Sequence, residues 1–208
     1  MFIPVDITEE AVELVAHKIL GSSGPGGTDL EELQGWLMKF GEDITRLSTI
    51  TETFVDWLAN GRTPWAAYRA FMSGLLIALE KQPVVRLVGV GETWRHLFAN
   101  IVLKVTGSEE TMECQYEQLC TRIKAGIDGV VHGVQYIWDE NSTTEDWRFL
   151  HLDANNTFSE INRVRMLWTA RHLWTSRPHF VFNFYRHWSS LVLQNGMGWQ
   201  VLCIVRRV

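Results

Sequence analysis

The sequence has few of the features that mark metal sites, membrane spans or secretion. Its three cysteines, Cys114, Cys120 and Cys203, fit no metal-ligand spacing and cannot all pair, which indicates a reducing, intracellular setting. No apolar run approaches the roughly 20 residues of a membrane helix. The acidic start, MFIPVDITEE, lacks the basic segment of a secretory signal. We therefore expect a protein of the cytoplasm or nucleus that does not enter a membrane.

Common catalytic and nucleotide-binding motifs are also missing. The seven histidines form no HxxxH or HExxH pair, and no G-x-S-x-G sequence presents a nucleophilic serine. The stretch GPGGTD lacks the Gly-Lys-Ser/Thr ending of a phosphate loop, and GVGETW lacks the third glycine of a dinucleotide loop. These absences argue against the standard hydrolases, metalloproteases and dinucleotide-binding proteins.

The composition is that of a folded globular chain with an uneven distribution of charge. Of 208 residues, 46% are hydrophobic and 21% charged, so one medium or two small cores can form. Residues 1–60 carry a net charge of −8, whereas residues 161–208 contain seven Lys or Arg and no acid. The basic, aromatic-rich end either meets phosphates and bases or extends its arginines over a buried aromatic helix.

Apolar spacing and capping residues predict a mostly helical α+β fold. Helices are predicted over 30–40, 44–58, 65–81, 92–107, 127–138 and 156–174, with a further helix after Pro178. Thr28, three residues before Glu31, is the predicted N-cap of the first of these. Short β-branched runs predict strands at 84–90, 147–153 and 190–194. Strands this far apart do not fit a regular βαβ sheet.

Asp153 is the candidate reactive residue. It ends the predicted strand WRFLHLD and precedes the predicted helix that begins in ANNTF. One interpretation is a helix N-cap, with the carboxylate accepting from the next backbone amides. The other is a metal-binding carboxylate at a strand end, as in enzymes that transfer nucleotidyl groups with two Mg²⁺ ions.

Two motifs in order resemble the reverse transcriptases of mobile retroelements. VVRLVGVGETWRHL is similar to a fingers strand close to R-P-[IV]-G-[IV]-G-E-x-x-R-R-L. FLHLDANNTFSEINR is similar to a palm strand close to L-D-x-x-N-A-F-N-x-x-N-R, and the upstream GPGGTDLEELQGWL looks like the turn and helix before the fingers in non-LTR elements. The resemblance covers roughly residues 24–194. It implies a fingers and partial palm fragment of a right-hand polymerase.

The resemblance also implies roles for individual residues. Asp153 would be the catalytic carboxylate that binds Mg²⁺, and the carbonyl of Ala154 would face the nucleotide-side metal. Phe158 would lie beneath the incoming sugar, although a core aromatic on a helix fits the same spacing. Arg86 would look toward the triphosphate, because a guanidinium suits phosphate oxygens. The alternative for Arg86 is a surface arginine on a short strand.

Departures from the family pattern predict that this chain is inactive alone. Leu87 stands where the family usually has Pro, and His96 where a second Arg is usual. The chain has no Asp-Asp pair and no Gln-Gly-Asp segment, so the partner carboxylates are missing. One carboxylate does not hold two divalent ions against their hydration. We therefore expect no bound Mg²⁺.

The resemblance divides the chain into three parts. Residues 1–107 are assigned to N-terminal helices and fingers, 108–198 to a partial palm, and 199–208 to a tail translated out of frame, because a one-nucleotide shift restores a family-like sequence. The resemblance also implies a partner, an RNA/DNA template-primer.

The candidate contacts for this template-primer are the arginines of the basic C-terminal region: Arg163, Arg165, Arg171, Arg177 and Arg186. We also expect self-association through exposed aromatic residues. The alternative is a non-enzymatic helical module that binds nucleic acid or a protein.

Overall fold

The computed structural model describes most of the chain as helices with a small sheet. The described residues are 3–82, 84–114, 124–144, 146–148, 150, 152, 161–174, 176, 178–195 and 198–203. They form two compact units, one made of Met1–Gly107 and Arg163–Val208 and the other of Ser108–Asn162. The α+β class predicted from the sequence is confirmed.

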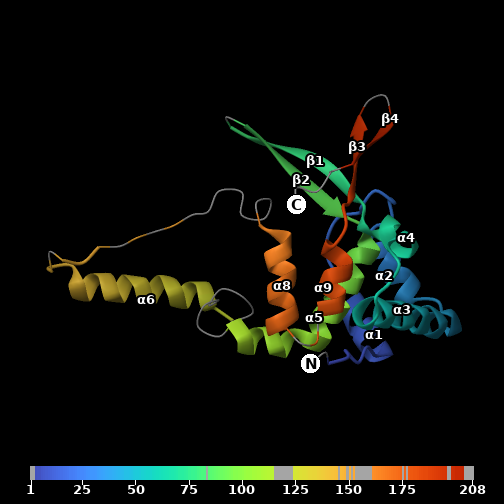
Figure 1. Ribbon diagram of the computed structural model, residues 1–208, viewed down its shortest axis with the longest axis horizontal. Coiled ribbons are helices and arrows are strands. Elements are labelled where there is room, and N and C mark those ends of the chain that lie inside the picture. Colours follow the sequence, from blue (N-terminus) through green and yellow to red (C-terminus); the bar gives the residue numbers. More distant parts are fainter. Residues whose placement is uncertain are drawn as a thin grey trace. The chain divides into compact units, whose positions relative to one another are not determined.

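The first unit begins with three amphipathic helices, of which the first two have side-chain N-caps. These are α1 (Glu9–Ala16), α2 (Leu30–Met38) and α3 (Glu42–Asn60) (Figure 1). The Thr8 side chain accepts from the amide of Ala11 in α1, and Asp29 Oδ1 accepts from Glu32 N at 2.7 Å in α2. The predicted cap Thr28 is therefore one residue off. Its carbonyl instead accepts a hydrogen bond from the Thr93 hydroxyl.

The helix predicted over 65–81 is wrong in its second half. The chain forms α4 (Trp65–Tyr68), the 3-10 turn η1 (Arg69–Met72) and then strand β1 (Gly74–Lys81). All eight residues of β1 pair antiparallel with β2 (Val84–Gly91), which was predicted as a strand. Leu, Ala, Glu and Lys in this segment favour a helix, but such intrinsic preferences are small in free energy. Pairing along the whole length of the hairpin outweighs them.

Two hairpins make up one small sheet in the described part of the chain. Strand β3 (Ser190–Asn195) pairs antiparallel with β4 (Gly198–Cys203), and the strand order is β2-β1-β3-β4. The hairpins join where Gly74 and Leu75 pair in parallel with Leu191 and Val192. A Cβ at Gly74 would lie 3.2 Å from Leu191 Cδ2, so glycine allows this close crossing. Figure 1 shows the outer ends of both hairpins extending away from the helices.

The remaining helices follow the sequence pattern more closely. They are α5 (Thr93–Cys114), α6 (Gly126–Asn141), α8 (Arg163–Leu173) and α9 (Pro178–Tyr185). Helix α5 passes Gly107 without a break and includes residues 108–114, part of the weakly patterned stretch 108–124 that is also predicted to be helical. None of the described helices combines the length and apolar character that a membrane span requires.

The core of the first unit lies between α1, α2, α3, α5 and α9. Its most deeply buried apolar side chains are Val12, Leu33, Leu37, Val55, Leu58, Tyr68, Met72, Leu97, Ile101 and Val102. Phe54, Phe71 and Phe98 form a ring cluster at its edge, with centroids 5.3–5.6 Å apart. This packing between distant segments fixes the start of α5 against the N-terminal helices.

The second unit contains α6, which has no buried residue. The apolar face predicted from Ile127, Val131, Val134 and Trp138 is exposed to solvent. The strand predicted at 147–153 is wrong for the residues that can be described there, because 147, 148, 150 and 152 have no regular secondary structure. Leu150 and Leu152 are also exposed.

Candidate functional site

Two glycine-rich stretches that are distant in sequence meet where β2 ends and α5 begins. The amide of Gly26 donates to Glu92 Oε1 at 2.9 Å, and the Thr93 hydroxyl donates to the carbonyl of Thr28 at 2.6 Å. Gly24 is buried here, and a Cβ on it would lie 2.6 Å from Glu92 Cα. The GPGGTD turn and the GVGETW turn therefore form one structural feature, which we call the β2–α5 junction (residues 24–28 and 91–96).

Glu92 is a half-buried carboxylate at this junction. Burial raises its pKa above the ordinary value, and the hydrogen bond from the Gly26 amide offsets part of that rise. The carboxylate ties the glycine turn to the first turn of α5. Its role among the described residues is to hold the junction together.

Arg95 and His96 converge above Gly91. A Cβ placed on Gly91 would lie 3.6 Å from Arg95 Nη1 and 3.6 Å from His96 Nε2. The Arg95 guanidinium also lies over the Phe184 ring of α9, 5.8 Å from its centroid. Such a contact between a cation and an aromatic face fixes the arginine side chain. The absence of a side chain at Gly91 leaves the space that both nitrogens face.

The electrostatics of this cluster are those of a desolvated cation. Burial lowers the pKa of Arg95; the nearby Tyr185 raises it, and the charge of Arg163 lowers it further. Burial and the charge of Arg95 lower the pKa of His96. The charge of Arg163 on α8 therefore acts on Arg95, whereas the lowered pKa of His96 favours its neutral form.

Arg86 is exposed on β2, as the fingers assignment and the surface alternative both allow. It is paired across the hairpin with Leu79. The apolar neighbours Val85 and Leu87 are also exposed, so this end of the hairpin has an uncovered surface.

The predicted catalytic residues lie outside the described part of the chain. Asp153, Ala154 and Phe158 fall there, as does Arg177, so their predicted roles stay predictions. Within the described ranges, no group of three or more His, Cys, Asp or Glu side chains gathers in a way that would hold a metal ion.

Helix α8 carries three of the arginines predicted to bind nucleic acid. Arg165 and Arg171 are exposed, and Arg163 is half-buried. Ala170 is the buried residue of α8. Trp168 is 63% exposed and stacks on His172, with ring centroids 4.1 Å apart. This helix presents arginines and an aromatic pair, and α8 itself contains no acidic residue.

Arg186 differs from these arginines, because it is a packing residue. Its Nη2 donates to the carbonyl of Thr63 and lies 3.3 Å from the hydroxyl of Tyr68. Its guanidinium lies over the Phe182 ring at 4.9 Å. A guanidinium held this way joins α9 to the start of α4 and is poorly placed to contact phosphates. The assignment of Arg186 to the nucleic-acid surface stays a prediction.

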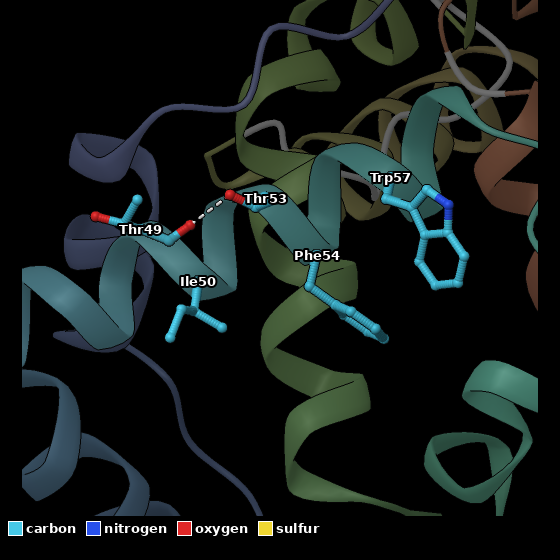
Figure 2. Close-up of a pocket in the computed structure, with 5 residues that line it drawn as sticks. All are labelled: Thr49, Ile50, Thr53, Phe54 and Trp57. Atoms are coloured by element: carbon cyan, nitrogen blue, oxygen red, sulfur yellow. Dashed lines mark hydrogen bonds between the residues drawn. The ribbon is translucent and has the colours of Figure 1, made fainter.

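A shallow pocket lies on the outer face of α3. Its volume is about 330 Å³, and its lining residues are Thr49, Ile50, Thr53, Phe54 and Trp57 (Figure 2). The Thr53 hydroxyl donates to the carbonyl of Thr49 at 2.8 Å, so the hydroxyl is already satisfied within the helix. The pocket is apolar and offers no charged group for catalysis.

No known protein family, curated protein or solved structure matches the chain. The similarity to reverse transcriptases therefore rests on the motifs in the sequence.

Arg95 is the site residue that sequence reasoning missed. Its signal was present, because Glu92 and Arg95 fill the E-x-x-R spacing of the fingers motif, with Glu92 directly before α5 and Arg95 in its first turn. The effect of the Arg163 charge on Arg95 arises between segments 68 residues apart, which spacing does not reveal.

Proposed function

We propose that the chain is the fingers and partial palm of a retroelement reverse transcriptase that binds nucleic acid but does not extend a primer. The joined β2–α5 junction is the observation that carries this proposal. The turn that resembles the segment before the fingers packs directly on the end of the strand that resembles the fingers, through Gly26–Glu92 and Thr28–Thr93. Both segments resemble parts of the same reverse transcriptase region, and their contact supports the proposal that they belong to one such region here.

The carboxylates of the chain do not suit the two Mg²⁺ ions of the family. Asp153 is the single acid at a family metal position, and no Asp-Asp pair follows it. Hard divalent cations need several oxygen ligands from the protein or substrate. The proposal is therefore for a binding protein of polymerase ancestry.

Helix α8 is the surface through which we propose that nucleic acid binds. Exposed aromatic rings stack on bases, and arginines neutralise phosphates. Trp168 and Arg171 supply both chemistries within one turn, and α8 has no carboxylate that would repel a phosphate. The acidic residues 1–60 do not favour binding at α1 to α3.

The test is fluorescence anisotropy with a labelled RNA–DNA hybrid duplex at low salt. We expect Arg171→Gln and Trp168→Ala each to weaken binding, by about 1–3 kcal/mol for loss of a stacking ring. Arg46→Gln is the matched control, because Arg46 is an exposed arginine on α3. Equal affinities for all three variants would remove α8 from the interface.

A further inference from the structure

The apolar pocket on α3 is the strongest feature without an assigned role. All five of its lining residues belong to α3, and Figure 2 shows the side chains of Ile50, Phe54 and Trp57 on one side of the helix. The Phe54 ring packs on the rings of Phe71 and Phe98, with centroids 5.5 and 5.3 Å apart, so this wall of the pocket is fixed to the core. Ile50 is 56% exposed. A pre-formed apolar pocket of this kind suits a large apolar side chain.

Acidic residues lie at both ends of this pocket. At one end, Glu9 of α1 accepts a hydrogen bond from the hydroxyl of Thr49, a lining residue. At the other end, Asp56 is exposed directly before Trp57. Helix α3 as a whole contains four acidic residues and one basic residue, Arg46. An apolar side chain that enters the pocket is therefore best accompanied by positive charge on both sides.

Helix α8 exposes a large ring between two positive charges. Trp168 is 63% exposed. Arg165 and Arg171 are exposed three residues before and three residues after it, which places all three on one side of the helix. The six residues from one arginine to the other span about 9 Å of helix axis, and the seven residues from Thr49 to Asp56 span about 10 Å. The positive charges of α8 are therefore spaced to match the two acidic ends of the pocket.

We infer that α8 of a second copy of the chain docks on α3, with its Trp168 ring in the pocket. Arg165 and Arg171 of that copy would face the carboxylates of Glu9 and Asp56. Both helices belong to the first compact unit, and the exposure of Trp168 means that its own chain does not bury the ring. In a two-fold symmetric dimer this contact forms twice, because each chain supplies one pocket and one ring. The contact is of the helix-in-groove kind.

Charge favours a second copy of the chain as the occupant of the pocket. Residues 161–208 contain no acid, so the basic end of one chain attracts the acidic residues 1–60 of another. A nucleic acid is instead repelled by the acidic ends of the pocket. The dimer would cover Trp168 and Arg171, through which we propose that α8 binds nucleic acid. This competition rests on the proposed function, whereas the dimer itself does not.

The experiment is sedimentation velocity on the full chain over about 1–100 µM. We expect the wild type to shift from monomer to dimer as its concentration rises. Ile50→Asp puts a charge at the pocket and Trp168→Ala removes the ring, so each should raise the dissociation constant of the dimer roughly tenfold or more. Both side chains are exposed, so folding should survive, and thermal melting checks it. Arg46→Gln, which removes a positive charge from α3, is the control and should dimerise at least as tightly as the wild type.

A pair of charge reversals distinguishes this contact from non-specific association of exposed aromatic residues. Asp56→Lys and Arg171→Glu should each weaken self-association, because each places like charges across the contact. In an equimolar mixture the two variants should form a heterodimer about as tight as the wild-type dimer. There the reversed charge on α3 of one chain meets the reversed charge on α8 of the other, and the unchanged surfaces meet as in the wild type.

A wild-type chain that stays monomeric throughout the concentration series would overturn the inference. Wild-type dimerisation by folded Ile50→Asp and Trp168→Ala, or no recovery of association in the mixture, would do the same. Fluorescence anisotropy with the hybrid duplex then tests the competition. At concentrations where the wild type is dimeric, Ile50→Asp leaves α8 intact and should bind the duplex more tightly, and equal affinity would overturn the competition. A dimer with the expected variant effects, but no duplex binding by Ile50→Asp, would contradict the proposed function alone.

Discussion

Asn183 shows how one polar side chain orders the core of the first unit. It is fully buried, and its Nδ2 donates to the carbonyls of Leu58 and Gly61 at 2.8 Å each. The backbone carbonyl of Asn183 accepts from the Tyr68 hydroxyl at 2.8 Å. These bonds satisfy carbonyls at the C-terminal end of α3, which a helix cannot satisfy itself. Asn183 thereby joins α3, α4 and α9.

Asn183→Ala should lower the free energy of unfolding by roughly 2–5 kcal/mol, because two buried carbonyls lose their donor. Urea denaturation measures the difference. The control is Asn141→Ala, which removes a solvent-exposed hydrogen bond from Asn141 Nδ2 to the carbonyl of Ile137 at 2.8 Å. We expect that change to stay within about 0.5 kcal/mol. Similar small effects for both variants would show that the Asn183 bonds contribute little.

Glu92 should make the stability of the protein fall as the pH rises. Because burial raises its folded pKa above the ordinary 4.5, the folded state binds the proton more tightly than the unfolded state between those two values. The free energy of unfolding therefore decreases across that window. Glu92→Gln keeps an oxygen to accept from Gly26 and removes the charge.

Denaturation of wild type and Glu92→Gln over about pH 4 to 7 measures this contribution. We expect the variant to gain stability relative to the wild type as the pH rises through the folded pKa. Glu80→Gln, at an exposed carboxylate on β1, controls for general effects of removing a charge. A difference between wild type and Glu92→Gln that does not change with pH would contradict the assignment.

At the scale of elements, local pattern predicted the helices better than the strands. Helix α3 and strand β2 follow directly from their apolar spacing and from β-branched residues. Strand β1 was missed because GLLIALEK suits a helix equally well, and its pairing with β2 decides the outcome. The same limit applies to the site, since the contact of Arg95 on α5 with the Phe184 ring on α9 joins segments far apart in the sequence.

The glycine turn at 24–28 provides a test of the β2–α5 junction as an element. A Cβ at Gly24 would lie 2.6 Å from Glu92 Cα and 2.7 Å from the carbonyl oxygen of Gly91. Both are backbone atoms, so no side-chain rotation can relieve the clash. Gly24→Ala should therefore displace the turn, at a cost of about 1–3 kcal/mol.

Hydrogen exchange at the Gly26 amide measures that displacement. In Gly24→Ala we expect the Gly26 amide to exchange faster, because the displaced turn moves this amide away from its acceptor, Glu92 Oε1. Ser22→Ala is the matched control, since Ser22 is exposed in the same segment. Protection of Gly26 that is equal in both variants would mean that the turn does not depend on this close approach.

At the scale of the whole molecule, charge separates the parts of the chain. The first 60 residues are strongly acidic and supply much of the core, whereas residues 161–208 carry arginines and no acid. In the described segments, Trp168 on α8 and Trp138 on α6 expose large aromatic surfaces. Such surfaces suit stacking on bases, and they also underlie the expected self-association.

The central proposal is that this chain binds nucleic acid. The most direct test is to measure its affinity for an RNA–DNA hybrid duplex across a series of salt concentrations. Counterion release predicts that the logarithm of the binding constant falls linearly with the logarithm of salt between about 50 and 200 mM. Two or three phosphates neutralised by α8 would give a slope of roughly −2 to −3. Absence of binding at low salt, or binding that salt does not weaken, would contradict the account.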